Sequence, residues 1–334
     1  MTTSAVTEKN SFMKILSNVW EFIKKIPPVF PIFIVLFVIV SFLSPTYSTA
    51  TGIMAFLRRT APLGILAIGQ MIVLATGGFD LSMGSVVALV CLVSSLLLAN
   101  DEANTYPTIG LMLILGAGIG LFNGFVVTFL KVPSFIATLG TMLAVRGIAL
   151  YWVGGAPKGY FTDNFRMWGR GYIENVPLVG RFPIGLIVLI VVGLISWFAF
   201  HKTNYGKQIL AIGDNVRAAK LSGVKVRIVR MSAFVVSAVL AVIGGVMIGG
   251  YGGVNVSIGE GLEMDSIAAA VVGGVVLGGG KGSVIPVIFG AYSLEILFSM
   301  LNLLGLPKPY KDSIQGLIII GAVAYVALSQ RKKR

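Results

Sequence analysis

The residues of this sequence best suited to chemistry are charged side chains that stand inside or beside long apolar runs. Asp80 and Ser82 follow one such run, and Arg146 and Glu295 lie inside two others. A carboxylate at the centre of a bilayer costs roughly 2.5–3.5 kcal/mol on insertion scales, so it normally faces a polar cavity or an opposite charge. These four residues are therefore candidates for a polar path through a membrane.

A structural role stays open for the same residues. Gly77 and Gly84 flank Asp80 and would allow a helix to break there, and Asp is a preferred N-cap residue at a broken helix. For Arg146 and Glu295, pairing with an opposite charge is favoured over a place on the path.

A second group of acids, Glu260, Glu263 and Asp265, precedes the apolar run at residues 267–280. These side chains could meet a polar substrate or a basic loop. The complete set of candidate path residues is Asp80, Ser82, Arg146, Asn255, Glu263, Asp265 and Glu295.

No group of residues predicts catalysis. Residues 278–282 read GGGKG, but the first glycine of a phosphate-binding loop would fall at Val275, and Gly282 stands where that loop needs Ser or Thr. The sequence shows no Ser-His-Asp, Cys-His or metal-ligand pattern, and its single cysteine, Cys91, excludes an internal disulfide. We therefore expect no enzyme activity, no cofactor and no metal site in this chain.

The composition places these residues in a membrane protein. Of the 334 residues, 56% are hydrophobic and only 12% are charged, which excludes a water-soluble domain. The net charge of +13 could suggest nucleic acid, but most basic residues fall in alternate segments between apolar runs, which is the positive-inside pattern. This asymmetry predicts a multi-pass protein without a nucleic-acid partner, with both termini and a polar segment, residues 1–28, in the cytoplasm.

Ten apolar runs predict an all-α fold of about ten transmembrane helices in a single domain, residues 1–334. The runs lie at 29–43, 61–76, 83–99, 109–130, 134–153, 184–200, 231–251, 267–280, 284–304 and 313–328. A full crossing needs roughly 20 residues, so the second, third, eighth and tenth runs are short. Short runs beside glycine clusters indicate broken or re-entrant helices, whose free backbone groups must be buried in protein or line a cavity.

An internal repeat divides the chain into halves. IGQMIVLATGGFDLSMG, residues 68–84, aligns with IGGVMIGGYGGVNVSIG, residues 243–259, at an offset of 175 residues, and Asn255 takes the place of Asp80. Chance similarity competes with this alignment in a chain with 42 glycines. Each half would hold five spans, and an odd number predicts that the halves are inverted in the membrane with the path between them.

Two connecting segments are long enough to contact partners. Residues 154–182 form a predicted extracytoplasmic loop that could dock a partner or stay a solvated loop. Residues 201–230 form a predicted cytoplasmic loop, rich in basic residues, in which Asn215 is a preferred helix N-cap and Gly223 suits the left-handed position after a helix. A short capped helix is expected between them. It could be presented to a soluble partner, or the loop could serve only to fix the topology.

The central loop also carries a family resemblance. AAKLSG, residues 218–223, resembles the Ala-Ala-x-x-x-Gly core of the coupling loop in permeases of ABC importers. The longer string YGKQILAIGDNVRAAKLSGV, residues 205–224, is similar to simple-sugar permeases of the ribose, galactose and xylose type. Three further strings agree, so the resemblance covers residues 60–330: GGFDLSMGS at 77–85, PSFIATLGTMLAVRG at 133–147 and GLEMDSIAAAVVGG at 261–274. Arg217 stands where the general importer pattern has Glu, and a later Ile-x-Leu-Pro is missing, which favours the sugar branch.

The resemblance implies a permease of the bacterial inner membrane that forms the path for a monosaccharide and works as a homodimer. A separate cytoplasmic ATPase would hydrolyse ATP, and an extracytoplasmic sugar-binding protein would deliver the sugar. Small alanines in the coupling helix would permit close approach of the ATPase. The residues that would couple the permease to the ATPase are Asn215, Arg217, Ala218, Ala219, Lys220 and Gly223.

Other functions stay open. An ABC permease for nucleosides or amino acids would share this architecture. An ion-coupled secondary sugar transporter could use Asp80, Arg146 and Glu295 as a relay, and it would explain the inverted repeat but not the capped basic loop. A membrane-embedded enzyme is disfavoured because no catalytic pattern is present.

Overall fold

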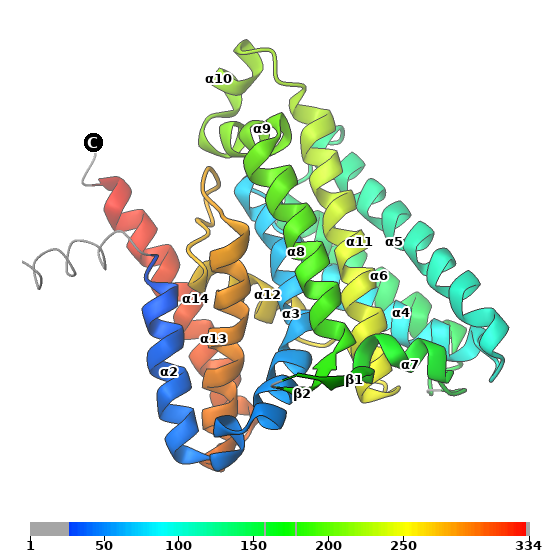
Figure 1. Ribbon diagram of the computed structural model, residues 1–334. Helices are drawn as coiled ribbons and strands as arrows, with labels where there is room; N and C mark the ends of the chain where they lie inside the picture. Colours follow the sequence, from blue (N-terminus) through cyan, green and yellow to red (C-terminus); the bar gives the residue numbers. More distant parts are fainter. Residues whose placement is uncertain (1–26, 157, 178, 332–334) are drawn as a thin grey trace, which may run out of the picture.

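The computed structural model describes residues 27–156, 158–177 and 179–331. Nearly all of the predicted N-terminal segment 1–28 therefore lies outside the described residues. Within them the chain is helical apart from one small hairpin, which confirms the all-α prediction (Figure 1).

Each predicted apolar run overlaps one helix, although the run at 267–280 extends beyond the end of its helix. The helices are α2 (Val29–Leu43), α3 (Ala50–Ala75), α4 (Met83–Leu97), α5 (Thr105–Thr128), α6 (Ser134–Trp152), α7 (Asp163–Arg170), α8 (Ile184–Lys202), α9 (Asn204–Asp214), α10 (Val216–Leu221), α11 (Val226–Gly252), α12 (Leu262–Val272), α13 (Val284–Leu303) and α14 (Lys308–Arg331). Of these, α7, α9 and α10 lie outside the predicted runs. Within the described ranges six helices, α3, α5, α6, α8, α11 and α13, are long and apolar enough to cross a membrane. Helices α2 and α4 are apolar but have only 15 residues each.

Two of the four runs predicted to be short belong to long helices, which corrects that prediction. Helix α3 has 26 residues and α14 has 24, whereas α4 has 15 and α12 has 11. The apolar run of α3 starts late because Arg58 and Arg59 interrupt it, yet the helix continues through both. Arg59 is accommodated by an ion pair with Glu295 of α13, 3.2 Å from Nε to Oε1, and the Arg58 guanidinium lies over the rings of Tyr172 and Tyr251.

Helices α3 and α11 form the centre of the bundle, where they pack against each other in opposite directions. Arg58 near the start of α3 contacts Tyr251 near the end of α11. At the other end, Arg230 Nη2 donates a hydrogen bond of 3.1 Å to the carbonyl of Thr76, which directly follows α3. The contacts at the two ends therefore fix an antiparallel pair.

Glycines set the close approach of α5 to α11. Gly116, Gly120 and Gly124 lie on one face of α5 at a spacing of four residues, which lets helices approach closely in lipid. A Cβ at Gly120 would meet the carbonyl of Phe234, and a Cβ at Gly124 would meet the backbone of Met231. Larger residues at these places would push the two helices apart.

Helices α3 and α11 are each followed by a glycine-containing break and then by a short helix. Residues 76–82 lead from α3 to α4, and residues 253–261 lead from α11 to α12. Met83 at the start of α4 and Ser237 of α11 both lie against Gly69 of α3, so α4 begins inside the bundle. A Cβ on Gly84 would meet the Glu263 carboxylate in the first turn of α12, so the two short helices begin beside each other.

The two short helices lead to opposite ends of the molecule. Ser95 near the end of α4 donates a 2.8 Å hydrogen bond to the carbonyl of Lys158, in the segment that leads to α7. The segment after α12 reaches α9, where the amide of Gly280 donates a 3.0 Å hydrogen bond to the carbonyl of Ala75 at the end of α3.

The segment 154–182, expected to be a loop, is folded in part. After α7 it forms an antiparallel hairpin of β1 (Tyr172–Val176) and β2 (Gly180–Pro183). Phe161 and Phe165 are buried and stack with ring centroids 4.6 Å apart, and Gly169 lies against the backbone of α11. Phe165 and Gly169 lie four residues apart on one face of α7, and this face and Phe161 pack against α11, which holds the segment on the bundle.

Candidate coupling surface and transport path

The predicted capped helix is present as α10 and projects from one end of the molecule (Figure 1). Asn215 Oδ1 accepts hydrogen bonds from the amides of Arg217 and Ala218, at 3.0 and 3.1 Å. Gly223 has a φ of +82°, which glycine adopts without strain, and its amide donates to the carbonyl of Lys220. Both predicted caps are therefore confirmed.

The side chains of α10 divide into an outer and an inner set. Arg217, Ala218 and Lys220 are exposed, whereas Ala219 is 3% exposed and belongs to the buried apolar core. The structure thus separates the two alanines, because Ala218 is accessible to a partner and Ala219 holds the helix on its own chain. Leu221 is 90% exposed at the end of α10. No sequence pattern predicts this exposure, since a leucine in a short helix usually faces inward.

Helices α9 and α10 form one unit, the α9–α10 unit, and its α9 end contacts the bundle directly. A Cβ on Gly213, near the end of α9, would meet the carbonyl of Ala75 and the amide of Gly280. Ser232 Oγ of α11 donates a 3.2 Å hydrogen bond to the hydroxyl of Tyr205 on α9. The α9–α10 unit therefore contacts the end of α3, the segment after α12 and α11.

Asp80 and Ser82 lie in a buried hydrogen-bond network, and both have no exposed surface. Asp80 Oδ1 accepts from the amide and the hydroxyl of Ser82, at 3.0 and 2.6 Å, and Oδ2 accepts from Ser237 Oγ of α11 at 2.7 Å. Asn123 Nδ2 of α5 donates to Ser82 Oγ at 2.9 Å, and Thr141 Oγ1 of α6 donates to Asn123 Oδ1 at 2.6 Å. The network ties the break after α3 to three other helices.

The partners in this network were missed by the sequence analysis. Asn123, Thr141 and Ser237 are single polar residues within apolar helices, and only the fold brings them to Asp80. Every oxygen of the Asp80 carboxylate has a hydrogen-bond partner, which fits a group that fixes the break in the helix. Asp80 and Ser82 are therefore buried within the protein and are not exposed on the wall of an open cavity.

The other candidate residues gather around the start of α12. Arg146 of α6 forms an ion pair with Glu260 and donates to the carbonyl of Val256 at 2.9 Å. Glu263 lies in the field of both Arg146 and Glu260. The neighbouring Asn255 is exposed in the break before α12. The side chains of Arg146 and Glu260 are 21% and 49% exposed, so this group opens onto a face of the molecule.

The same group continues towards α14 and α13. Asp265, Glu260, Lys308, Asp312 and Gln315 line a cavity of about 270 Å³ between α12 and α14. Glu295 is close enough to Asp265 and to Lys311 to act on both electrostatically. We name the whole group the charged belt, and its members are Arg59, Arg146, Glu260, Glu263, Asp265, Glu295, Lys308, Lys311 and Asp312.

The sequence predicts some members of the charged belt as candidate path residues. Arg146 and Glu295 both pair with opposite charges, with Glu260 and Arg59, as the favoured interpretation held. At the same time both lie near the acids of α12. The belt can bind a polar solute through charge-assisted hydrogen bonds, and the positive end of the α12 dipole favours the carboxylates gathered there.

Comparison with known proteins identifies a family whose sequence pattern this chain shares. The family model described as "Branched-chain amino acid transport system / permease component" matches residues 52–323. The chain belongs to this family. The permease is therefore a multi-pass membrane protein and a transport subunit rather than a catalytic one.

Relatives of the permease match along nearly their whole length. Ribose import permease protein RbsC of Bacillus subtilis (strain 168) is 35% identical over 317 residues, which cover 93% of the permease and 94% of that protein. RbsC of Escherichia coli (strain K12) is 33% identical over 299 residues, covering 87% and 90%. Galactose/methyl galactoside import permease protein MglC of Escherichia coli (strain K12) is 35% identical over 324 residues, covering 92% and 95%. No solved structure matches the permease significantly.

Proposed function

We infer that the permease forms the membrane path of an ATP-driven importer for a monosaccharide. The relatives named for ribose and for galactose support this substrate class. The observation that supports the path is the charged belt, in which the Glu260 side chain is 49% exposed and the Glu263 carboxylate lies where the two half-length helices begin.

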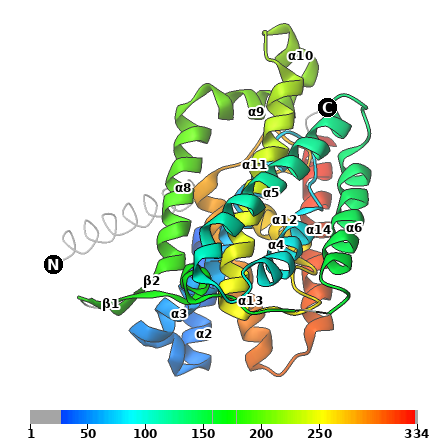
Figure 2. The ribbon, with the colours of Figure 1, turned by 90° about the vertical axis from the view of Figure 1, so that its right-hand side faces the viewer.

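The position of the charged belt indicates which face meets the path. Charged side chains within membrane-spanning helices are expensive against lipid and almost always face a bundle interior or a water-filled cavity. The belt opens on the face formed by α6, α12 and α14, opposite α8 (Figure 2). We propose that a second copy of the permease covers this face and that the sugar passes between the two copies.

The element order supports two inverted halves with ten spans. Helices α2 to α6 would form one half, and α8 with α11 to α14 would form the other. The corresponding helices α3 and α11 are antiparallel, each is followed by a break, and the short helices α4 and α12 lead to opposite ends of the molecule. Inverted repeats with broken helices at matching places are characteristic of transport paths at the bilayer midplane.

The surface of α10 is proposed to bind the ATPase on the cytoplasmic side. Its exposed residues are basic or small, apart from the apolar Val216 and Leu221, and its base contacts the end of α3 and the segment after α12 through α9. With α10 in the cytoplasm, α7 and the hairpin face the opposite side, where a sugar-binding protein would dock. Both termini would then lie in the cytoplasm.

Uptake by reconstituted complexes tests this function. The tagged permease is purified from its native membranes with the proteins that accompany it, and the complex is placed in proteoliposomes. We expect labelled ribose or galactose to accumulate only when the ATPase side receives ATP. Accumulation by the permease alone, driven by a proton gradient, would establish a secondary transporter. Accumulation of leucine in place of sugar would establish an amino-acid permease.

A further inference from the structure

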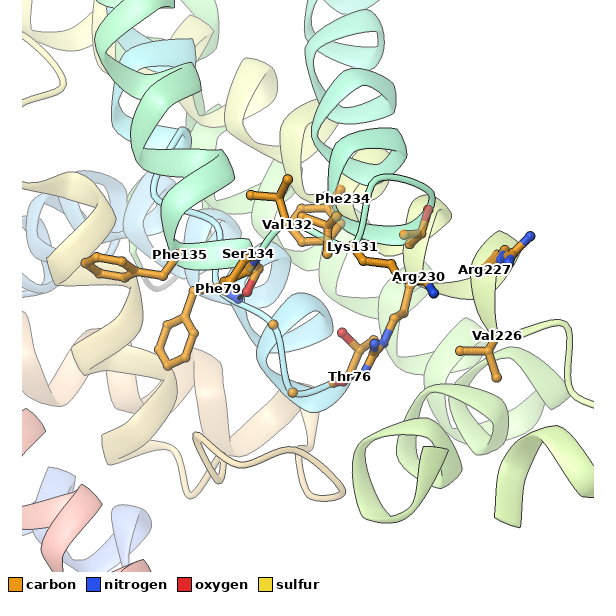
Figure 3. Close-up of a pocket in the computed structure, with 15 residues that line it drawn as sticks. Thr76, Phe79, Lys131, Val132, Ser134, Phe135, Val226, Arg227, Arg230 and Phe234 are labelled. Atoms are coloured by element: carbon orange, nitrogen blue, oxygen red, sulfur yellow. Dashed lines mark hydrogen bonds between the residues drawn. The ribbon is translucent and has the colours of Figure 1, made fainter. Parts of the chain in front are cut away.

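A second polar cavity, of about 540 Å³, lies at the end of the bundle that carries α10 and is separate from the charged belt. It is bounded by the ends of α3 and α5 and by the starts of α6 and α11 (Figure 3). Lys131, Arg227 and Arg230 line it, and its lining contains no carboxylate. None of the three forms an ion pair with another residue in the described part of the chain.

The backbone and the neighbouring side chains hold these cations at the cavity. Lys131 has a φ of +59°, unusual for a long side chain, in the turn between α5 and α6. Arg230 reaches the carbonyl of Thr76, and the Arg227 guanidinium lies over the ring of Phe129 at 5.3 Å from its centroid. The three positive charges come from two segments that are distant in sequence, and a ligand with negative charge would relieve their mutual repulsion.

An apolar surface adjoins the cations on the outside of the bundle. Phe125 and Phe129 of the α5 end stack with centroids 5.3 Å apart and are 46% and 43% exposed. Leu130 next to them is exposed as well. The cations could bind the charged group of an amphipathic molecule, and the exposed aromatic rings beside them could contact its apolar part.

We propose that this cavity binds the phosphate headgroup of an anionic phospholipid from the leaflet on the α10 side, with the acyl chains along Phe125 and Phe129. Basic pockets between membrane helices recognise lipid headgroups through the same combination of charge and enclosure. The site lies beside the start of α11 and the end of α3, and both helices contact the α9–α10 unit, through Ser232 and Ala75. A bound lipid would therefore stiffen the part of the permease through which α10 acts.

Native mass spectrometry of the purified full-length permease tests the proposal. The protein is held in nanodiscs that contain phosphatidylglycerol and phosphatidylcholine, and the retained lipids are counted after release. We expect one retained phosphatidylglycerol per chain. The affinity for phosphatidylglycerol should be about fivefold lower in Lys131→Asn and in Arg227→Gln, because one basic residue near an anionic membrane surface contributes about this factor. Asparagine keeps the left-handed backbone at residue 131.

The control variant is Lys207→Gln, which removes an exposed positive charge from α9 outside the cavity and should retain the lipid as the parent does. Equal retention in all four proteins would overturn the proposal. Inorganic phosphate and glycerol 3-phosphate distinguish the source of the phosphate. Displacement of the lipid by either compound at millimolar concentration would assign the cavity to a soluble anion, and failure of both to displace it supports the lipid. Neither result depends on sugar transport.

Discussion

Asp80 shows how a single carboxylate can be placed deep in a membrane protein. Its two oxygens accept three hydrogen bonds from Ser82 and Ser237, and Asn123 continues the network to α5. The break after α3 needs such an acceptor because its backbone amides have left the helix. We interpret Asp80 as the residue that fixes the geometry of the break, and the charged belt as the part of the molecule that meets solute.

Replacing Asp80 by alanine should therefore destabilise the permease. The change leaves the Ser237 hydroxyl and the Ser82 donors without their acceptor, and each unsatisfied buried group costs about 1–3 kcal/mol. We expect a lower melting temperature and lower membrane abundance, with uptake per folded molecule nearly unchanged. Asp214→Ala, which removes an exposed carboxylate, is the control. If uptake per folded molecule falls instead, Asp80 takes part in transport.

Among the elements, α10 is the one that connects local chemistry to the rest of the molecule. Its caps and its length follow from Asn215 and Gly223, its exposed side carries Ala218 and Lys220, and its inner side is held by Ala219. Because Ala219 is buried, Ala219→Trp would distort the loop itself. Loss of the ATPase in that variant would therefore not identify a docking surface.

Leu221→Ala gives the clearer test of docking. The side chain is 90% exposed, so its removal should leave the fold intact. If the ATPase covers it, the lost apolar contact amounts to roughly 1–2 kcal/mol, or about five- to thirtyfold in affinity. Affinity is measured by titrating the purified ATPase against the permease in nanodiscs. Leu304→Ala, which removes another exposed leucine beyond the end of α13, should bind as the parent does. Unchanged binding by Leu221→Ala would exclude this residue from the interface.

The sequence predicts elements better than it predicts their partners. Each apolar run overlaps one of the long or apolar helices, and the caps of α10 followed from local residue preferences. The start of α3 was misjudged because Arg58 and Arg59 look like a helix boundary, and only the fold shows that Glu295 and two tyrosines accommodate them. The hairpin was missed because its strands have five and four residues. Contacts such as Asp80 with Ser237 depend on packing that no local pattern encodes.

At the scale of the whole molecule, one face differs from the rest. The face formed by α6, α12 and α14 combines the charged belt with exposed apolar residues such as Leu143 and Leu317. Exposed apolar residues alone would be compatible with contact to lipid, but the charged side chains of the belt are not. The two together fit a surface covered by another protein chain.

Thiol cross-linking tests this arrangement. The single cysteine of the chain, Cys91, is buried, so the parent protein should not react. Leu317→Cys on α14 is expected to give covalent dimers with a bifunctional thiol reagent in native membranes. Leu194→Cys on α8, which is similarly exposed but lies on the opposite side, should give none. Dimers that form through Leu194→Cys alone would move the interface to the α8 face.

The shortness of α12 bears on the order in which the helices of this protein insert into the membrane. At 1.5 Å per residue its 11 residues reach about 16 Å, and its first turn carries Glu263 and Asp265. Such a segment cannot partition into lipid unaided, so its insertion should wait until α13 has been synthesised. A truncated chain that is released after residue 275 should leave a cysteine placed at Ala268 open to a water-soluble thiol reagent. A released chain that extends past residue 304 should protect it, and protection in the shorter chain would show that α12 enters the membrane without α13.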